Sequence, residues 1–208
     1  MSNEMIQNNR AFYEMQLSAA RWLANHKPEE LATKSGAIFH EEKSLLEIQS
    51  LNQTIEISIP EYRFHPEIEE WRQLVTLHYL DLADGAEVSA EQVSFGGLKD
   101  GLIRGTKFDQ YMDNELQLFL TGKTPEQLLK IFKSLGGEIV EDRSDLCMVF
   151  PFLPYYPVWL KIWFADEEFG ASGKMLLSKS ADHYLTVEDA VTVGDILLSR
   201  LKSEAEKK

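Results

Sequence analysis

The chain has 208 residues, of which 44% are hydrophobic and 26% charged, and its 34 acidic residues against 21 basic ones give a net charge of −13. This negative field repels phosphate backbones and anionic lipid, so we expect neither a nucleic-acid partner nor a membrane partner. The single cysteine, Cys147, excludes an internal disulfide and an all-cysteine zinc or iron–sulfur site built within one chain.

The first half of the chain is predicted to hold helices around a β-hairpin. Helical spacing of apolar residues, strict alternation of isoleucines with polar residues, and proline or glycine at element ends are the signals. The expected elements are a helix over Asn3–His26, a helical turn over Pro28–Lys34, strands over Ser44–Gln49 and Thr54–Ile59 joined by a turn at Leu51–Gln53, and a helix over Pro66–Asp84.

The second half is predicted to hold most of the strands. Thr124 and Gln127 form a capping-box pattern at the start of one helix, and Thr186 is expected to cap the last one. The expected elements are a long connection over Ala86–Thr106, a helix over Thr106–Leu120, a helix from Pro125 that Gly136 stops, strands over Glu138–Glu141, Leu146–Phe150, Val158–Phe164 and Lys174–Leu177, and a helix over Val187–Lys202.

The order of these elements does not alternate as strand–helix–strand units. We therefore predict an α+β fold, with a mixed, largely antiparallel sheet and helices packed against it. Residues 1–208 are expected to form a single domain, with a frayed tail over 203–208. The apolar run Val158–Phe164, with Lys161 as its one charge, predicts a central strand covered on both faces, in which Trp163→Ala would cost about 3–5 kcal/mol if the ring is fully buried.

Three consecutive carboxylates, Asp166, Glu167 and Glu168, follow this strand. Carboxylates at the end of a rigid strand can bind a cation or exchange protons, so they are our candidate ligand-binding residues. Successive side chains point in different directions, so we expect at most two to converge, with Glu168 inward and the third solvated or paired with Lys161. The alternative is a solvated acidic turn from which Phe169 folds back into the core.

His78 lies on the apolar stripe of the helix predicted over Pro66–Asp84, and it is the candidate neighbour of these carboxylates. The alternative is a core histidine whose hydrogen bonds are satisfied internally, because a metal site needs partner ligands. No other histidine stands at helical i, i+4 spacing from it, and no HExxH motif occurs. The sequence therefore predicts no identifiable metal or cofactor, and the reaction of any enzyme built on these residues is left open.

The amino-terminal residues MSNEMIQNNR contain no apolar signal core, and the chain has no run of 18 apolar residues. A cytoplasmic location is the simplest expectation.

Several segments of the chain resemble a known family. They are WRQLVTLHYLDLADG over 71–85, Val93–Phe95 with Leu98 and Gly101, Phe152–Pro154, Pro157–Trp163, Asp166–Phe169 and Tyr184–Asp189. The pattern resembles the domain-of-unknown-function family numbered 3786, from anaerobic bacteria and archaea, over roughly residues 10–200. Gly170-Ala171-Ser172 departs from the family, in which a continuation with proline is expected.

Some members of this family are joined to a four-cysteine iron–sulfur domain of the kind found in corrinoid proteins. The resemblance thus implies an accessory or ligand-binding module with a protein partner in an anaerobic metalloenzyme system, although one cysteine cannot supply the iron–sulfur module. An enzyme that uses Asp166–Glu168 with His78 is the other hypothesis. A metal or cofactor retained by the purified protein would favour a ligand-dependent role, and a surface with no concave site near those residues would favour protein interaction.

Overall fold

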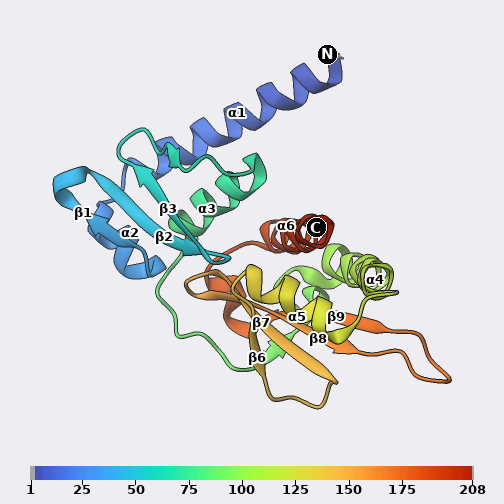
Figure 1. Ribbon diagram of the computed structural model, residues 1–208. Helices are drawn as coiled ribbons and strands as arrows, with labels where there is room; N and C mark the ends of the chain where they lie inside the picture. The colour runs from blue at the N-terminus through green and yellow to red at the C-terminus, as the bar shows by residue number, and fades with distance from the viewer. Residues whose placement is uncertain (1–2, 208) are drawn as a thin grey trace.

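The computed structural model of the protein describes residues 3–207 and confirms the predicted α+β class. Over these residues the chain forms six α-helices and two β-sheets (Figure 1). Every strand pair in the two sheets is antiparallel over the same range. The division of the strands between two sheets is a feature that the sequence did not predict.

The first sheet has the strand order β1-β2-β3-β4, and its central hairpin matches the prediction. Ile48 and Ile55 pair across this hairpin. Two short edge strands, β1 and β4, were not predicted. The elements of this half are α1 (Asn3–Leu23), α2 (Pro28–Ser35), β1 (Ile38–His40), β2 (Leu45–Ser50), β3 (Gln53–Ser58), β4 (Phe64–His65) and α3 (Glu70–Leu82).

The second sheet has the strand order β5-β9-β8-β7-β6, so the predicted central position of the apolar strand is confirmed. Three helices lie in the same half of the chain as this sheet (Figure 1). Its elements are β5 (Gln92–Val93), the 3-10 turn Phe95–Gly97, α4 (Gly101–Leu120), α5 (Pro125–Ser134), β6 (Glu138–Val140), β7 (Leu146–Leu153), β8 (Tyr156–Trp163), β9 (Ser172–Ser178), the 3-10 turn Lys179–His183 and α6 (Val187–Glu206).

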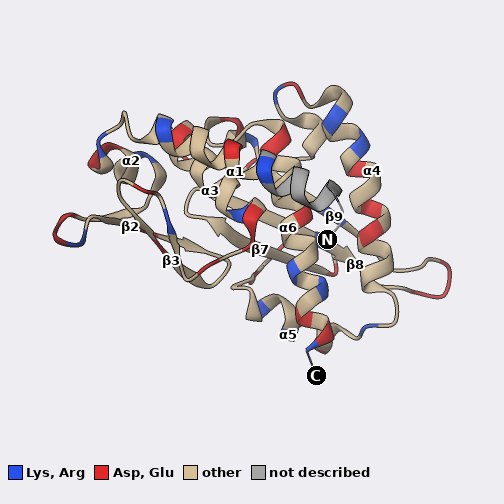
Figure 2. Ribbon diagram, turned by 90° about the horizontal axis from the view of Figure 1, so that it is seen from above, with Lys and Arg blue, Asp and Glu red and all other residues tan. Residues whose placement is uncertain are grey.

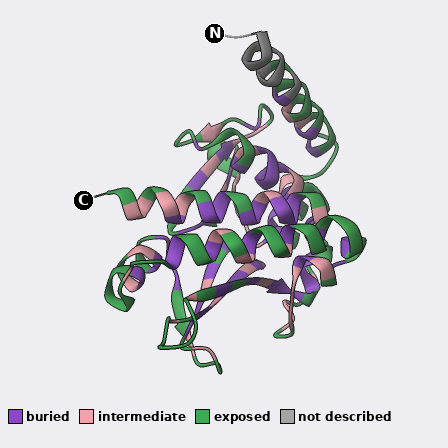
Figure 3. Ribbon diagram, turned by 90° about the vertical axis from the view of Figure 1, so that its right-hand side faces the viewer, coloured by how far each residue is buried: buried purple, intermediate pink, exposed green. Residues whose placement is uncertain are grey.

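The core of the second half lies between this sheet and the helices α4 and α6, which turn their buried sides toward it (Figure 3). Alternate residues of β8 are fully buried, among them Leu160 and Ile162. The opposite face carries Trp159, Lys161 and Trp163, and Trp163 is 36% exposed. The second face of this strand is thus covered at Trp159 but not at Trp163, so the condition of full burial set for the cost of Trp163→Ala is not met.

Helix boundaries follow local signals at some ends and tertiary packing at others. The capping boxes at Thr124 and Thr186 are both present. Helix α4 begins at Gly101 rather than at Thr106, because its first turn packs closely against the Phe95 carbonyl, where a Cβ on Gly105 would clash. Helix α6 continues to Glu206, beyond the predicted end at Lys202.

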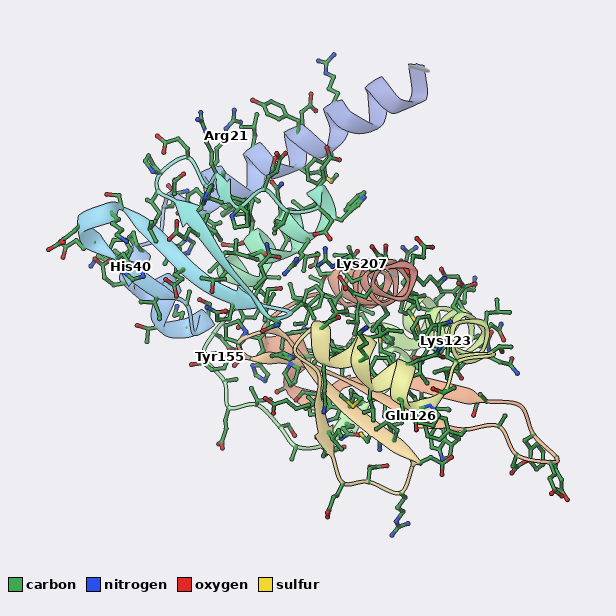
Figure 4. All side chains as sticks on the ribbon, viewed as in Figure 1. Arg21, His40, Lys123, Glu126, Tyr155 and Lys207 are labelled. Carbon is green, nitrogen blue, oxygen red and sulfur yellow. The ribbon has the colours of Figure 1, made fainter. Side chains whose placement is uncertain are left out.

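Helix α3 connects the two halves through Tyr79. The Tyr79 hydroxyl donates a hydrogen bond to the Ser35 carbonyl over 2.7 Å and accepts one from the Tyr155 backbone N–H over 3.0 Å. Figure 4 shows Tyr155 where the two halves meet. Nearby, the Leu51 backbone N–H donates to the Pro151 carbonyl over 3.0 Å, so the tip of the first hairpin is bonded to strand β7.

Candidate functional site

The predicted carboxylates lie in the exposed loop between β8 and β9. The Asp166 Oδ1 atom accepts hydrogen bonds from the backbone N–H groups of Phe169 and Glu168, over 2.7 and 2.8 Å, and these bonds lower the pKa of Asp166. Glu168 is exposed rather than inward-facing, so that expectation is wrong. Phe169 is 70% exposed, so it does not fold back into the core either.

Lys161 does not pair with this acidic loop. Its Nζ atom contacts Asp142 Oδ2 at 2.8 Å, across the turn that precedes β7. The expected pairing of Lys161 with one of the three carboxylates is therefore wrong, because β8 directs Lys161 to the turn before β7 rather than toward its own exit. Among residues 3–207, Lys161 and the acidic loop belong to separate networks.

His78 has a carboxylate partner that the sequence did not reveal. Its Nδ1 atom lies 2.7 Å from Oδ1 of Asp189, a residue 111 positions later that stands on α6. The hydrogen bond to Asp189 raises the pKa of His78, although burial opposes that shift. Burial alone would raise the pKa of Asp189, but the hydrogen bonds from His78 and Thr186 hold it below its ordinary value.

The start of α6 holds Asp189 in place. Thr186 caps the helix, and its hydroxyl donates to Asp189 Oδ2 over 2.7 Å. The Asp189 backbone N–H in turn donates to Thr186 Oγ1 over 3.2 Å. One carboxylate oxygen thus serves the capping box and the other serves His78, which fixes the orientation of the imidazole.

A second histidine–aspartate pair lies beside the same helix start. His183 Nδ1 is 2.7 Å from Asp84 Oδ2, so the end of α3 is joined to the turn before α6. Asp182 Oδ2 accepts a hydrogen bond from the Lys99 backbone N–H over 2.9 Å, which joins the loop before α4 to this turn. Three distant segments therefore meet at the start of α6.

A pocket of about 270 Å³ lies where these segments meet, and we name it the α6 pocket. Its walls combine apolar and charged side chains. The lining residues are Leu82, Asp84, Lys99, Asp100, Asp182, His183, Leu185, Thr186 and Val187.

Asp100 is the uncommitted carboxylate of this lining. It precedes α4 in the left-handed conformation, with φ of 59°, and within residues 3–207 its side chain makes no capping hydrogen bond. A non-glycine residue in that conformation is uncommon, and such residues gather at functional sites. An aspartate at this position ordinarily caps the helix, so the Asp100 carboxylate remains available to a ligand.

Tyr156 adds a buried polar group with no partner. Its hydroxyl is buried and makes no hydrogen bond within the described part of the chain. Burial, and then the negative charges of Asp182 and Asp189, raise the pKa of Tyr156 well above its ordinary value. A buried hydroxyl without a partner is rare in proteins, and here it lies close to the carboxylates around the start of α6.

The arrangement suits binding better than nucleophilic catalysis. Asp189 orients His78, and such a histidine can exchange a proton through its other nitrogen. The nearby Thr186 hydroxyl, however, is bonded to Asp189 rather than to His78. Over residues 3–207, no group of three or more histidine, cysteine, aspartate or glutamate side chains is placed to hold a metal ion.

The His78–Asp189 pair predicts a pH dependence of stability. The raised pKa of His78 stabilises the fold below the unfolded value of about 6.5, and this contribution is lost as the pH rises through the folded pKa. The lowered pKa of Asp189 stabilises the fold above about pH 3.9, and that contribution is lost as the pH falls through the folded pKa. The stability lost in His78→Gln should therefore be greatest between about pH 4 and 6.5.

Urea unfolding at several pH values measures this difference. His26→Gln is the matched control, because His26 is exposed and its ring bonds only the Trp22 carbonyl among the residues described. A stability difference for His78→Gln that grows between pH 6.5 and 9 would contradict the assignment.

Sequence reasoning located His78 and the capping box but missed the pocket. Asp84, Asp100, Asp182 and His183 carry no local signal of a shared site, since they lie in segments that only the fold brings together. Two of the segments that carry the family resemblance, 71–85 and 184–189, hold His78, Asp84 and Asp189. The presence of these three residues in the family segments was the one signal in the sequence that could have pointed to this region.

Comparison with known proteins gives a family but no characterised relative. Within residues 3–207, none of the helices combines the length and the apolar composition needed to cross a membrane. No match was found among curated proteins or among solved structures. The family model described as "Domain of unknown function (DUF3786)" matches residues 27–200, which is most of the chain. The chain therefore belongs to this family, as the resemblance of its motifs indicated.

Proposed function

We propose that the protein is a ligand-binding module and that its ligand is a small organic cation held in the α6 pocket. The observation that carries this proposal is the free carboxylate of Asp100 in the lining of that pocket. Asp84 and Asp182 add two further carboxylates, against one lysine, Lys99, and the imidazole of His183. The surplus of negative charge favours a positively charged ligand.

The shape and walls of the pocket narrow the ligand class. A volume of about 270 Å³ lies below the usual range for drug-sized ligands, so it suits a short molecule. Leu82, Leu185 and Val187 offer apolar contacts beside the carboxylates. An alkylamine with a short carbon chain meets both requirements, with its ammonium group on Asp100 and its chain on the apolar wall.

Titration with n-pentylamine, followed by amide NMR shifts, tests the proposal. The amine should shift resonances of the residues that line the α6 pocket, whereas 1-pentanol and pentanoate of the same length should bind at least about tenfold more weakly. Asp100→Asn should weaken amine binding by about tenfold, because it removes the uncommitted charge and keeps the side-chain size.

Glu167→Gln is the matched control, since it removes one negative charge from the exposed β8–β9 loop. Equal binding of the amine and the alcohol would contradict the proposal, as would an equal loss in both variants. A loss confined to Glu167→Gln or Glu168→Gln would instead support Asp166–Glu168 as the ligand-binding residues. Their role, alone or with His78 in an enzyme, stays a prediction, and no observation in the structure adds to it.

Three further expectations remain proposals. A protein partner in an anaerobic metalloenzyme or corrinoid system rests on the family resemblance alone. Absence of nucleic-acid binding rests on the net charge of −13 and on the dispersal of the basic residues among acidic ones, since helices such as α4 carry both kinds (Figure 2). A cytoplasmic location rests on the character of the amino-terminal sequence.

A further inference from the structure

Helix α1 has two apolar stripes, and only one of them is buried against the body of the protein. Phe12, Ala19 and Leu23 are buried, and the Phe12 ring meets Trp71 of α3 edge-on at 5.7 Å between centroids. The second stripe, which we name the outer stripe, lies about a quarter-turn around the helix. It consists of Tyr13, Leu17 and Ala20 of α1 and of Ala24, which directly follows the helix and whose backbone N–H bonds the Ala20 carbonyl.

The outer stripe forms one wall of a groove of about 570 Å³. Tyr13 is 59% exposed and Leu17 is 38% exposed, so the larger side chains of the stripe face solvent. The opposite wall is the turn between β3 and β4, with Pro60 and Phe64. Figure 1 shows α1 along the edge of the molecule, away from α4 and α5.

The spacing of the outer stripe indicates what the groove accepts. Its members follow one another by four, three and four residues, which is the a/d seam of an antiparallel or parallel helix pair. We propose that the occupant is α1 of a second copy of this chain, packed antiparallel along the first. A closed two-fold arrangement of this kind uses the same surface on both copies.

Side-chain size favours the antiparallel direction. With Leu17 set opposite Ala20 of the second copy, Tyr13 falls opposite Ala24, so each large side chain meets a small one. A parallel pair would place Tyr13 against Tyr13 and Ala20 against Ala20, which would leave a clash at one end and a gap at the other. The alternation of sizes therefore fits a copy of the same helix running the opposite way.

Charge complementarity supports the same pairing. Glu14 and Arg21 flank the outer stripe on one side, seven residues apart, which places both at the e position of the heptad. In an antiparallel pair these positions face each other, so Glu14 meets Arg21 of the second copy at two symmetric places. Arg21 makes no ion pair within residues 3–207 and lies at the outer surface (Figure 4), whereas Glu14 has an exposed contact with Arg10 at 3.3 Å.

Sedimentation velocity on the full chain from about 5 to 500 µM tests the proposal. The protein should approach a dimer at the upper end, and Leu17→Glu should remain monomeric because it buries a charge in the seam. Met15→Glu is the matched control, since Met15 is exposed on the opposite side of α1, and it should dimerise normally. Circular dichroism confirms that each variant is folded.

A charge-reversal pair tests the direction of packing. Arg21→Glu should weaken dimerisation by roughly tenfold, because two opposite-charge contacts become like-charge contacts. Adding Glu14→Arg to that variant should restore most of the affinity, since the contacts are then re-formed with the signs exchanged. If either residue acted only in the folding of its own chain, the second substitution would not restore dimerisation.

Three results would overturn the proposal: a monomer at every concentration, a dimer that Leu17→Glu leaves intact, or a dimer that Ile103→Glu dissociates. The last would assign the interface to α4, where Ile103, Tyr111 and Leu118 are also exposed. Amine binding in the α6 pocket is measured separately, because that pocket shares no lining residue with the groove beside α1.

Discussion

Replacing Phe150 with alanine should lower the free energy of unfolding by about 3–5 kcal/mol. Phe150 lies in β7, its side chain is fully buried, and its ring meets Phe132 of α5 edge-on at 5.8 Å between centroids. Truncation removes the buried ring and leaves a cavity between the sheet and the helix, which the surrounding residues can fill only in part. Urea denaturation with a two-state fit measures the change.

Trp163→Ala is the matched comparison for that experiment. Trp163 is also an aromatic residue of the second sheet, but it stands at the end of β8 and is 36% exposed. Its replacement should cost clearly less than about 3 kcal/mol, because the ring already contacts solvent. Equal losses for the two variants would contradict the burial that the structure assigns to them.

Replacing Arg72 with methionine should destabilise the protein by roughly 3 kcal/mol. Arg72 is fully buried on α3, and its guanidinium donates to the Ser50 carbonyl over 2.7 Å, to Ser50 Oγ over 3.2 Å and to Gln53 Oε1 over 3.0 Å. Methionine fills similar space but leaves these buried acceptors without donors. The Arg72→Lys variant should be intermediate, because a single ammonium cannot reproduce the planar fork.

Arg200→Met is the control for this prediction. Arg200 and Arg72 both contact Glu69: Arg200 Nη1 lies 2.8 Å from Glu69 Oε1, and Arg72 Nη1 lies 3.6 Å from Glu69 Oε2. The Arg200 side chain, however, is 32% exposed. Half-exposed ion pairs contribute little, so this variant should lose at most about 1 kcal/mol. If Arg72→Met unfolded at the same urea concentration as the unchanged protein, the hydrogen bonds of the guanidinium would contribute nothing to the free energy of unfolding, and the prediction would be wrong.

The parts of the fold that were predicted from the sequence are those set by neighbouring residues. The capping box of Thr124 with Gln127 and the isoleucine alternation of β3 are local patterns, and both elements form where expected. Helix α3 begins at Glu70 rather than at Pro66, and α4 begins earlier than expected. The sequence predicted a long connection over Ala86–Thr106, whereas Gly101 and Gly105 lie within α4 because their missing side chains allow close packing.

The candidate site was less predictable because its contacts span the chain. Nothing local to His78 indicates that Asp189 lies 2.7 Å away, since 111 residues separate them. Conversely, the acidic run at Asp166–Glu168 is conspicuous in the sequence, but its loop leads away from α3 into solvent. The sequence therefore drew attention to carboxylates that are adjacent in the chain, and not to those that the fold gathers around the start of α6.

The hydrogen bond between Leu51 and Pro151 has a consequence for the behaviour of the protein at high concentration. Strand β6 covers only three residues of the eight-residue strand β7, which leaves the other end of β7 as an edge of the sheet. An open edge is a template on which a strand of another chain can add, and natural sheets protect such edges. The tip of the β2–β3 hairpin covers this edge by bonding the Pro151 carbonyl, and Pro151 itself has no N–H to offer an incoming strand. The first sheet thereby shields the second from edge-to-edge aggregation.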